Sequence, residues 1–167
     1  MALRSSLGWL LLALMGDAIG PDAILSRPGD AERGRQVFFA GSENSCQGCH
    51  RIGGKGTEVG PDLSKVGAKY TKPEILKHIL QPSLLIESPY RTYLLETKSG
   101  RIVSGLIAEK TDREVVLKDA KGRLTRVPAS DVADLVPSPK SMMPDLLLRD
   151  LTAQQAADLL EFLATRQ

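Results

Sequence analysis

The feature that most constrains this chain is the motif Cys46-Gln47-Gly48-Cys49-His50, which contains both of its cysteines. Two thiols three residues apart, followed directly by a histidine, are the pattern to which c-type haem is attached. Thiols about one helical turn apart can each add to a vinyl group on the same edge of a porphyrin, and the next imidazole then points at the iron. Covalent attachment suits a chain with only three Phe, three Tyr and one Trp to build an aromatic core.

Two cysteines at this spacing also occur as zinc ligands, as redox-active dithiols and as structural disulfides. A zinc site would need two more ligands, and beyond His50 the chain offers only one further histidine, His78, and no further cysteine. A thioredoxin-like dithiol would follow a βαβ pattern, which is not present before Cys46. A disulfide that closes so short a loop would stabilise little. The sequence therefore favours haem attachment and leaves a thiol–disulfide function as a weaker alternative.

Residues 1–20 have the pattern of a secretory signal peptide. Arg4 supplies the positive start, and the apolar run from Leu7 to Met15 is too short to span a bilayer. Ala18 and Gly20 place small residues where cleavage after Gly20 requires them. An uncleaved membrane anchor is the alternative. We therefore expect an exported protein, periplasmic or otherwise extracytoplasmic, or one anchored in the membrane.

The remaining chain predicts one domain with an insertion, since 167 residues suit a single ordinary domain. The formal net charge of +2 favours neither nucleic acid nor a polyanionic surface as a partner. Pro21 and Pro28 predict a disordered lead-in over residues 21–28. Apolar residues at helical spacing predict helices over residues 30–39, 72–80 and 152–165.

Between residues 89 and 137 the hydrophobic period changes to two, which predicts four or five short strands in a small antiparallel sheet or barrel. Turn signals separate the strands at Ser99-Gly100, Thr111-Asp112 and Lys121-Gly122. The glycines of residues 53–56 (GGKG) and 60–63 (GPDL) lack the strand and the Gly-Lys-Ser/Thr of a phosphate-binding loop. Backbone passing close to a flat cofactor explains them better.

With its elements in this order, the chain resembles a class I c-type cytochrome with one haem. The shared features are a helix before Cys-x-x-Cys-His, a Gly-Pro-x-Leu loop, a late Met-Pro and a closing amphipathic helix. The resemblance implies a mainly α cytochrome c fold of residues 29–88 and 138–167. The β-rich segment of residues 89–137 is inserted before the methionine, as in a bacterial group of haem-binding domains, so the fold class expected is α+β. In the family the terminal helices cross at a small residue and an aromatic, here Gly34 and Phe38 against Leu159 and Phe162.

The same resemblance implies a role for individual residues. The residues expected to contact haem are Cys46, Cys49, His50, Pro61, Leu63 and Met143. The family's loop proline accepts a hydrogen bond from Nδ1 of the haem histidine, which orients the ring. The two iron ligands would be His50 and Met143. Because Met142 and Met143 are adjacent, only one can face the iron from an extended segment, and Pro144 favours an extended Met143. His78 is the next candidate for the sixth ligand.

These expectations combine into one function, a c-type cytochrome that carries single electrons outside the cytoplasm by means of one covalent haem c. Two protein ligands fill both axial positions of the iron, so we expect an electron carrier and not an enzyme. Its partner would be a redox protein, such as a dehydrogenase that it accepts electrons from or another cytochrome, docked through the haem edge or the β insert. A haem-based sensor or ligand-binding module is the main alternative.

Overall fold

A computed structural model describes residues 20–41 and 45–167, so the signal predicted for residues 1–20 lies, except for Gly20, outside the described residues. The three helices predicted from apolar spacing are present as α2 (Ala31–Phe38), α4 (Lys72–Leu80) and α5 (Ala153–Ala164). Each begins directly after an N-cap residue that favours a helix start, Asp30, Thr71 or Thr152. Asp30 accepts the amide of Arg33 at 2.8 Å, and Thr152 forms a capping box with Gln155.

Shorter helical turns connect these helices. The α-helical ones are α1 (Pro21–Leu25) and α3 (Val66–Lys69), and the 3₁₀ turns are η1 (Cys46–Gly48), η2 (Ser88–Tyr90) and η3 (Ala129–Asp131). The predicted disordered lead-in over residues 21–28 is therefore wrong. Pro21 starts α1 at the position where its missing amide costs nothing, and Ile24 is only 1% exposed within the helical core. Among the described residues no helix is long and apolar enough to cross a bilayer.

The helical core is centred on the crossing of α2 with α5. A Cβ on Gly34 would lie 1.9 Å from the carbonyl oxygen of Asp158, so only glycine allows the two helices to approach this closely. One turn further on, the rings of Phe38 and Phe162 lie 5.7 Å apart. The crossing expected from the family resemblance is thus present, with Asp158 and Phe162 at the closest contact and Leu159 buried beside them.

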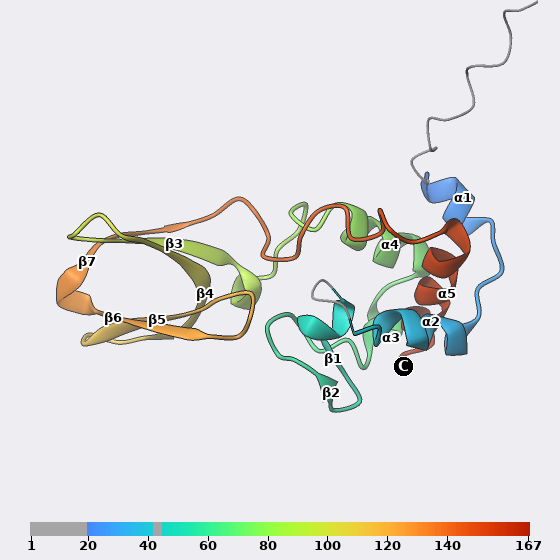
Figure 1. Cartoon of the computed structure of the whole chain (residues 1–167), viewed down its shortest axis with the longest axis horizontal. Coiled ribbons are helices and arrows are strands. Elements are labelled where there is room, and N and C mark those ends of the chain that lie inside the picture. The colour runs from blue at the N-terminus through green and yellow to red at the C-terminus, as the bar shows by residue number, and fades with distance from the viewer. Residues whose placement is uncertain (1–19, 42–44) are drawn as a thin grey trace, which may run out of the picture.

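Residues 92–137 form an antiparallel sheet of five strands, within the predicted range of four or five. They are β3 (Thr92–Thr97), β4 (Ile102–Lys110), β5 (Glu114–Lys118), β6 (Leu124–Pro128) and β7 (Val132–Pro137), in the order β6-β5-β4-β3-β7. The sheet has its own small core, centred on Leu95, Val115, Leu117 and Val127. Figure 1 shows the sheet curled at one end of the long axis and the helices at the other.

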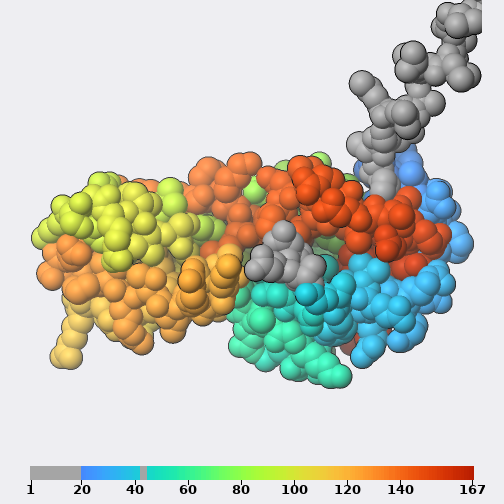
Figure 2. Space-filling view, in the orientation of Figure 1, coloured from blue at the N-terminus to red at the C-terminus, as the bar shows by residue number. Residues whose placement is uncertain are grey.

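The sheet lies between α4 and α5 in the sequence and beside the helical part in space. Figure 2 shows the two parts in contact, with the segment after β7 running across the top from one to the other. A second, two-stranded sheet of β1 (Arg51–Ile52) and β2 (Lys55–Gly56) directly follows the cysteine motif. The molecule is therefore α+β, and the motif lies where its helical and sheet parts meet.

Candidate functional site

The cysteine motif folds as one tight turn. Cys46 begins η1, and the amide of His50 donates to the carbonyl of Cys46 at 2.8 Å. This turn brings Cys49 and His50 onto the wall of one cavity, while Cys46 packs against the edge of the helical core. Both sulfurs are free thiols.

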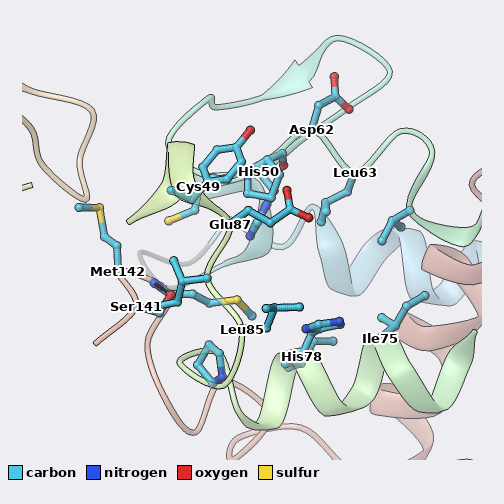
Figure 3. A pocket seen from close by; sticks show the side chains of 18 of the residues that line it. Cys49, His50, Asp62, Leu63, Ile75, His78, Leu85, Glu87, Ser141 and Met142 are labelled. Atoms are coloured by element: carbon cyan, nitrogen blue, oxygen red, sulfur yellow. Dashed lines mark hydrogen bonds between the residues drawn. The ribbon is translucent and has the colours of Figure 1, made fainter. Parts of the chain in front are cut away.

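The cavity has a volume of about 530 Å³, and its wall is mostly apolar (Figure 3). Five of the six residues predicted to contact the cofactor line it, and these are Cys49, His50, Pro61, Leu63 and Met143. The wall also includes α4, the segment of residues 82–87, and Leu106 from strand β4. The helical part and the sheet therefore enclose the cavity together.

His50 is held in a defined orientation by the loop after the motif. Its Nδ1 lies 2.8 Å from the carbonyl oxygen of Pro61. A carbonyl oxygen can only accept, so Nδ1 carries the proton and Nε2 keeps its lone pair. Burial lowers the pKa of His50, opposed by the hydrogen bond to Pro61, so the imidazole is neutral near pH 7. The ring is thus prepared to bind a metal through Nε2.

Two glycines allow this loop to lie directly against His50. A Cβ on Gly60 would lie 2.6 Å from Cε1 of the His50 ring, and a Cβ on Gly56 would lie 2.2 Å from the His50 carbonyl oxygen. Gly56 also has a φ of +103°, which favours glycine. Gly60 also lines the cavity, in agreement with backbone that passes close to the cofactor. Gly56 and Gly60 in addition make room for the histidine.

Burial sets the state of the two thiols. It raises the pKa of Cys46 to about 11 and also raises the pKa of Cys49. Both are therefore protonated at neutral pH, whereas a disulfide oxidoreductase needs a thiolate of lowered pKa. This argues against the thiol–disulfide alternative.

Two neighbouring methionines, Met142 and Met143, line the same cavity. The amide of Met143 donates to Oγ of Ser141 at 3.1 Å, and the amide of Ser141 donates to Oγ of Ser83 at 3.0 Å, so this loop is tied to the segment after α4. Figure 3 shows the Met142 side chain pointing away from His50. His78 also lines the cavity, with its ring 4.7 Å from that of Tyr70.

Several cavity residues were not predicted from the sequence. The clearest are Leu106 of the sheet, Tyr90 of η2, and the ion pair of Lys69 with Glu87. The two-residue period marks Leu106 as part of a strand, but it cannot show that this strand packs against the helical part. No short sequence motif marks Tyr90, Lys69 or Glu87 as cavity residues, because the placement of η2 and α3 depends on tertiary contacts.

These donors suit a porphyrin better than a bare metal ion. In the described part of the chain, no group of three His, Cys, Asp or Glu side chains is placed to hold an ion. The cavity wall instead offers the thiol of Cys49, one oriented imidazole and a thioether, with the second thiol, Cys46, one turn away in the same motif. These are the groups that attach and ligate haem c. Gly60 lets the loop approach the ring, and the hydrogen bond to Pro61 keeps the imidazole in place.

Comparison with known proteins agrees with this chemistry. Residues 31–92 match the family model described as Cytochrome c. The chain is also 51% identical over 39 residues to cytochrome c oxidase subunit 2 of Alkalihalophilus pseudofirmus. That match spans 23% of this chain and only 10% of the relative, so the two proteins share a segment and not a whole architecture.

The matched residues include the motif, the Pro61 loop and α4, and the matched range as a whole supplies most of the residues that line the cavity. Members of the cytochrome c family are electron-transfer proteins that carry covalently attached haem c. Residues 31–92 of this chain therefore form a cytochrome c domain, consistent with class I of the c-type cytochromes, a family whose cofactor is covalently attached haem c.

Proposed function

We propose that this protein carries single electrons outside the cytoplasm by means of one covalently attached haem c. The observation that carries the proposal is the hydrogen bond from His50 Nδ1 to the Pro61 carbonyl, which leaves Nε2 free toward an apolar cavity beside Cys49. When bound, haem c supplies an iron that alternates between ferric and ferrous states and so accepts and returns one electron. The protein's residues attach it, orient it and limit its contact with water.

Each residue has a separate task in this proposal. Cys46 and Cys49 would form the two thioether bonds that hold haem c, and His50 and Met143 would bind its iron. Histidine and methionine ligands would give a higher reduction potential than two nitrogen ligands. With two protein ligands, the iron would have no free position for a substrate, which suits an electron carrier better than an enzyme. Leu63 and the Pro61 loop close one side of the cavity.

The β sheet of residues 92–137 is, in this proposal, an insertion into the cytochrome c domain. Strand β3 begins at the last residue of the family match, and α5, which completes the helical core against α2, comes after β7.

The expected partner is another redox protein, such as a dehydrogenase or a second cytochrome. Export follows from the signal predicted over residues 1–20, and from the attachment of bacterial c-type haem outside the cytoplasm. Mass spectrometry of the periplasmic fraction would show a mature chain starting near Pro21 if that signal is cleaved.

The test is the visible spectrum and haem content of the full chain produced in a host that matures c-type cytochromes. We expect haem to stay with the polypeptide after acid–acetone extraction, and a potentiometric titration to follow a one-electron curve. Cys46→Ser combined with Cys49→Ser should remove all covalent haem, because no other cysteine can form a thioether. Extractable haem in the wild-type protein, or covalent haem in the double variant, would contradict the proposal.

A further inference from the structure

One face of the sheet is directed at the cytochrome c domain. Thr92, Leu106 and Lys118 stand opposite one another on β3, β4 and β5, so their side chains project from the same face. Leu106 is 4% exposed and lines the haem cavity, and Thr92 is also buried. Lys118 therefore belongs to the same cross-strand row of side chains as Leu106, which is part of the cavity wall.

Lys118 forms a direct bond to the loop behind His50. Its Nζ donates to the carbonyl oxygen of Glu58 at 2.6 Å, across a sequence separation of 60 residues. Gly122, in the turn after β5, lies near the same loop, because a Cβ added to it would lie 3.9 Å from Cγ2 of Val59. Gly105 lets β4 approach β5 at this row, since a Cβ there would lie 2.7 Å from the Lys118 carbonyl oxygen.

The loop that receives this bond holds the cysteine motif through its backbone. The amides of Val59 and Gly60 both donate to the Cys49 carbonyl, at 3.1 and 2.7 Å. Pro61, the next residue, accepts the Nδ1 proton of His50. Residues 58–61 thus connect the ammonium group of Lys118 to the ring of His50 through one short stretch of backbone. We call these four residues the proximal loop.

We infer that Lys118 is a positioning residue for the haem histidine, and that the sheet fixes the proximal loop from outside the cytochrome c domain. This inference rests on the proposed function, because it concerns how His50 is held for the iron. A hydrogen bond from a charged donor is stronger than one from a neutral donor. The bond of Lys118 joins strand β5 of the sheet to the proximal loop of the cytochrome c domain. Without Lys118, the proximal loop would keep its bonds to the motif but lose its anchor to the sheet.

The test is to measure hydrogen exchange by NMR in the full, haem-loaded protein. The protons observed are the Nδ1 proton of His50 and the amide protons of Val59 and Gly60. In Lys118→Met, these protons should exchange about tenfold faster, the change expected when one charge-assisted hydrogen bond is lost. Lys118→Arg keeps a charged donor and should restore slow exchange. The matched control is Lys110→Met, at the exposed end of β4.

The amides of Val116 and Leu117 separate a local effect from loss of the sheet, because both residues lie buried in β5. Their exchange should stay unchanged in Lys118→Met. If they exchange faster as well, or if the His50 and Gly60 protons do not respond to the loss of Lys118, the inference is wrong. A wild-type protein without covalent haem would instead refute the proposed function, so the two failures can be told apart.

Discussion

The proton on Nδ1 of His50 determines what this side chain can bind. Nδ1 donates a hydrogen bond to the carbonyl oxygen of Pro61, 2.8 Å away, so the ring can offer only Nε2 to a metal. The sequence predicts the motif from its spacing alone, because the two thiols and the imidazole are local. The contact with Pro61 was expected only through the resemblance to a family. The role of Gly60 beside the ring depends on distances that no pattern of residues reveals.

A second prediction about individual residues is that Met143, and not Met142, binds the iron. Met143→Ala should abolish the methionine–iron charge-transfer band of the oxidised protein and let carbon monoxide bind the ferrous form. Met142→Ala should keep the band, because this side chain points away from His50 (Figure 3). Absorption spectra of the two variants provide the measurement. Loss of the band in Met142→Ala alone would show that the assignment is off by one residue, and loss in neither would point to His78.

Among the helices, the pairing of α2 with α5 depends on one buried carboxylate. Asp158 accepts Nε of Arg33 at 2.7 Å, Nη2 of Arg33 at 2.8 Å and the amide of Asp30 at 2.8 Å. These bonds lower the pKa of Asp158 to about 2. The approximate limits of both helices followed from the spacing of apolar residues in the sequence. The burial of Asp158 did not, since an acid within an apolar stripe gives no sign of its distant partner.

Asp158→Asn should lower the free energy of unfolding by about 2 kcal/mol at pH 7, because Arg33 would lose a charged partner and the Asp30 amide a strong acceptor. The pKa of Asp158 is lower in the folded state than in the unfolded state, so the ionised carboxylate stabilises the protein above about pH 4. This contribution is lost as the pH falls toward 2. The difference between wild type and Asp158→Asn should therefore shrink over that range.

Denaturant unfolding at several pH values measures this effect. The matched control is Asp150→Asn, whose carboxylate pairs with Arg149 on the surface and should change stability by less than about 0.5 kcal/mol. An equal loss in both variants, or a loss in Asp158→Asn that does not depend on pH, would contradict the role assigned to Asp158.

At the scale of the whole molecule, the sheet and the cytochrome c domain share the cavity. The existence of the sheet was predicted from a two-residue period and from turn signals, and Gly100 and Gly122 do form two similar turns, with φ of +82° and +75°. Its position was not predictable. The alternation that makes Leu106 a strand residue is the same whether the strand faces solvent, a partner or the haem cavity.

Replacing residues 94–136 with about four Gly and Ser residues tests this shared enclosure. A short linker suffices because Tyr93 and Pro137 are paired neighbours on β3 and β7. We expect covalent haem to remain, since the motif and its core lie elsewhere. The reduction potential should fall, because removal of Leu106 exposes the cofactor to water. Acid–acetone extraction and potentiometry are the measurements. Failure to incorporate haem would mean that the sheet belongs to the folding unit of the cavity.

The packing of α2 against α5 also has a consequence for the order of events during biosynthesis. A ribosome makes the cysteine motif and α2 early, then the whole sheet, and only afterwards the helix that completes the crossing at Gly34. Until α5 arrives, the helical core cannot close, because this helix supplies Leu159, Leu160 and Phe162 to it. A shortened chain that ends before α5 should therefore fail to form this core, although it contains both the cysteine motif and the whole sheet.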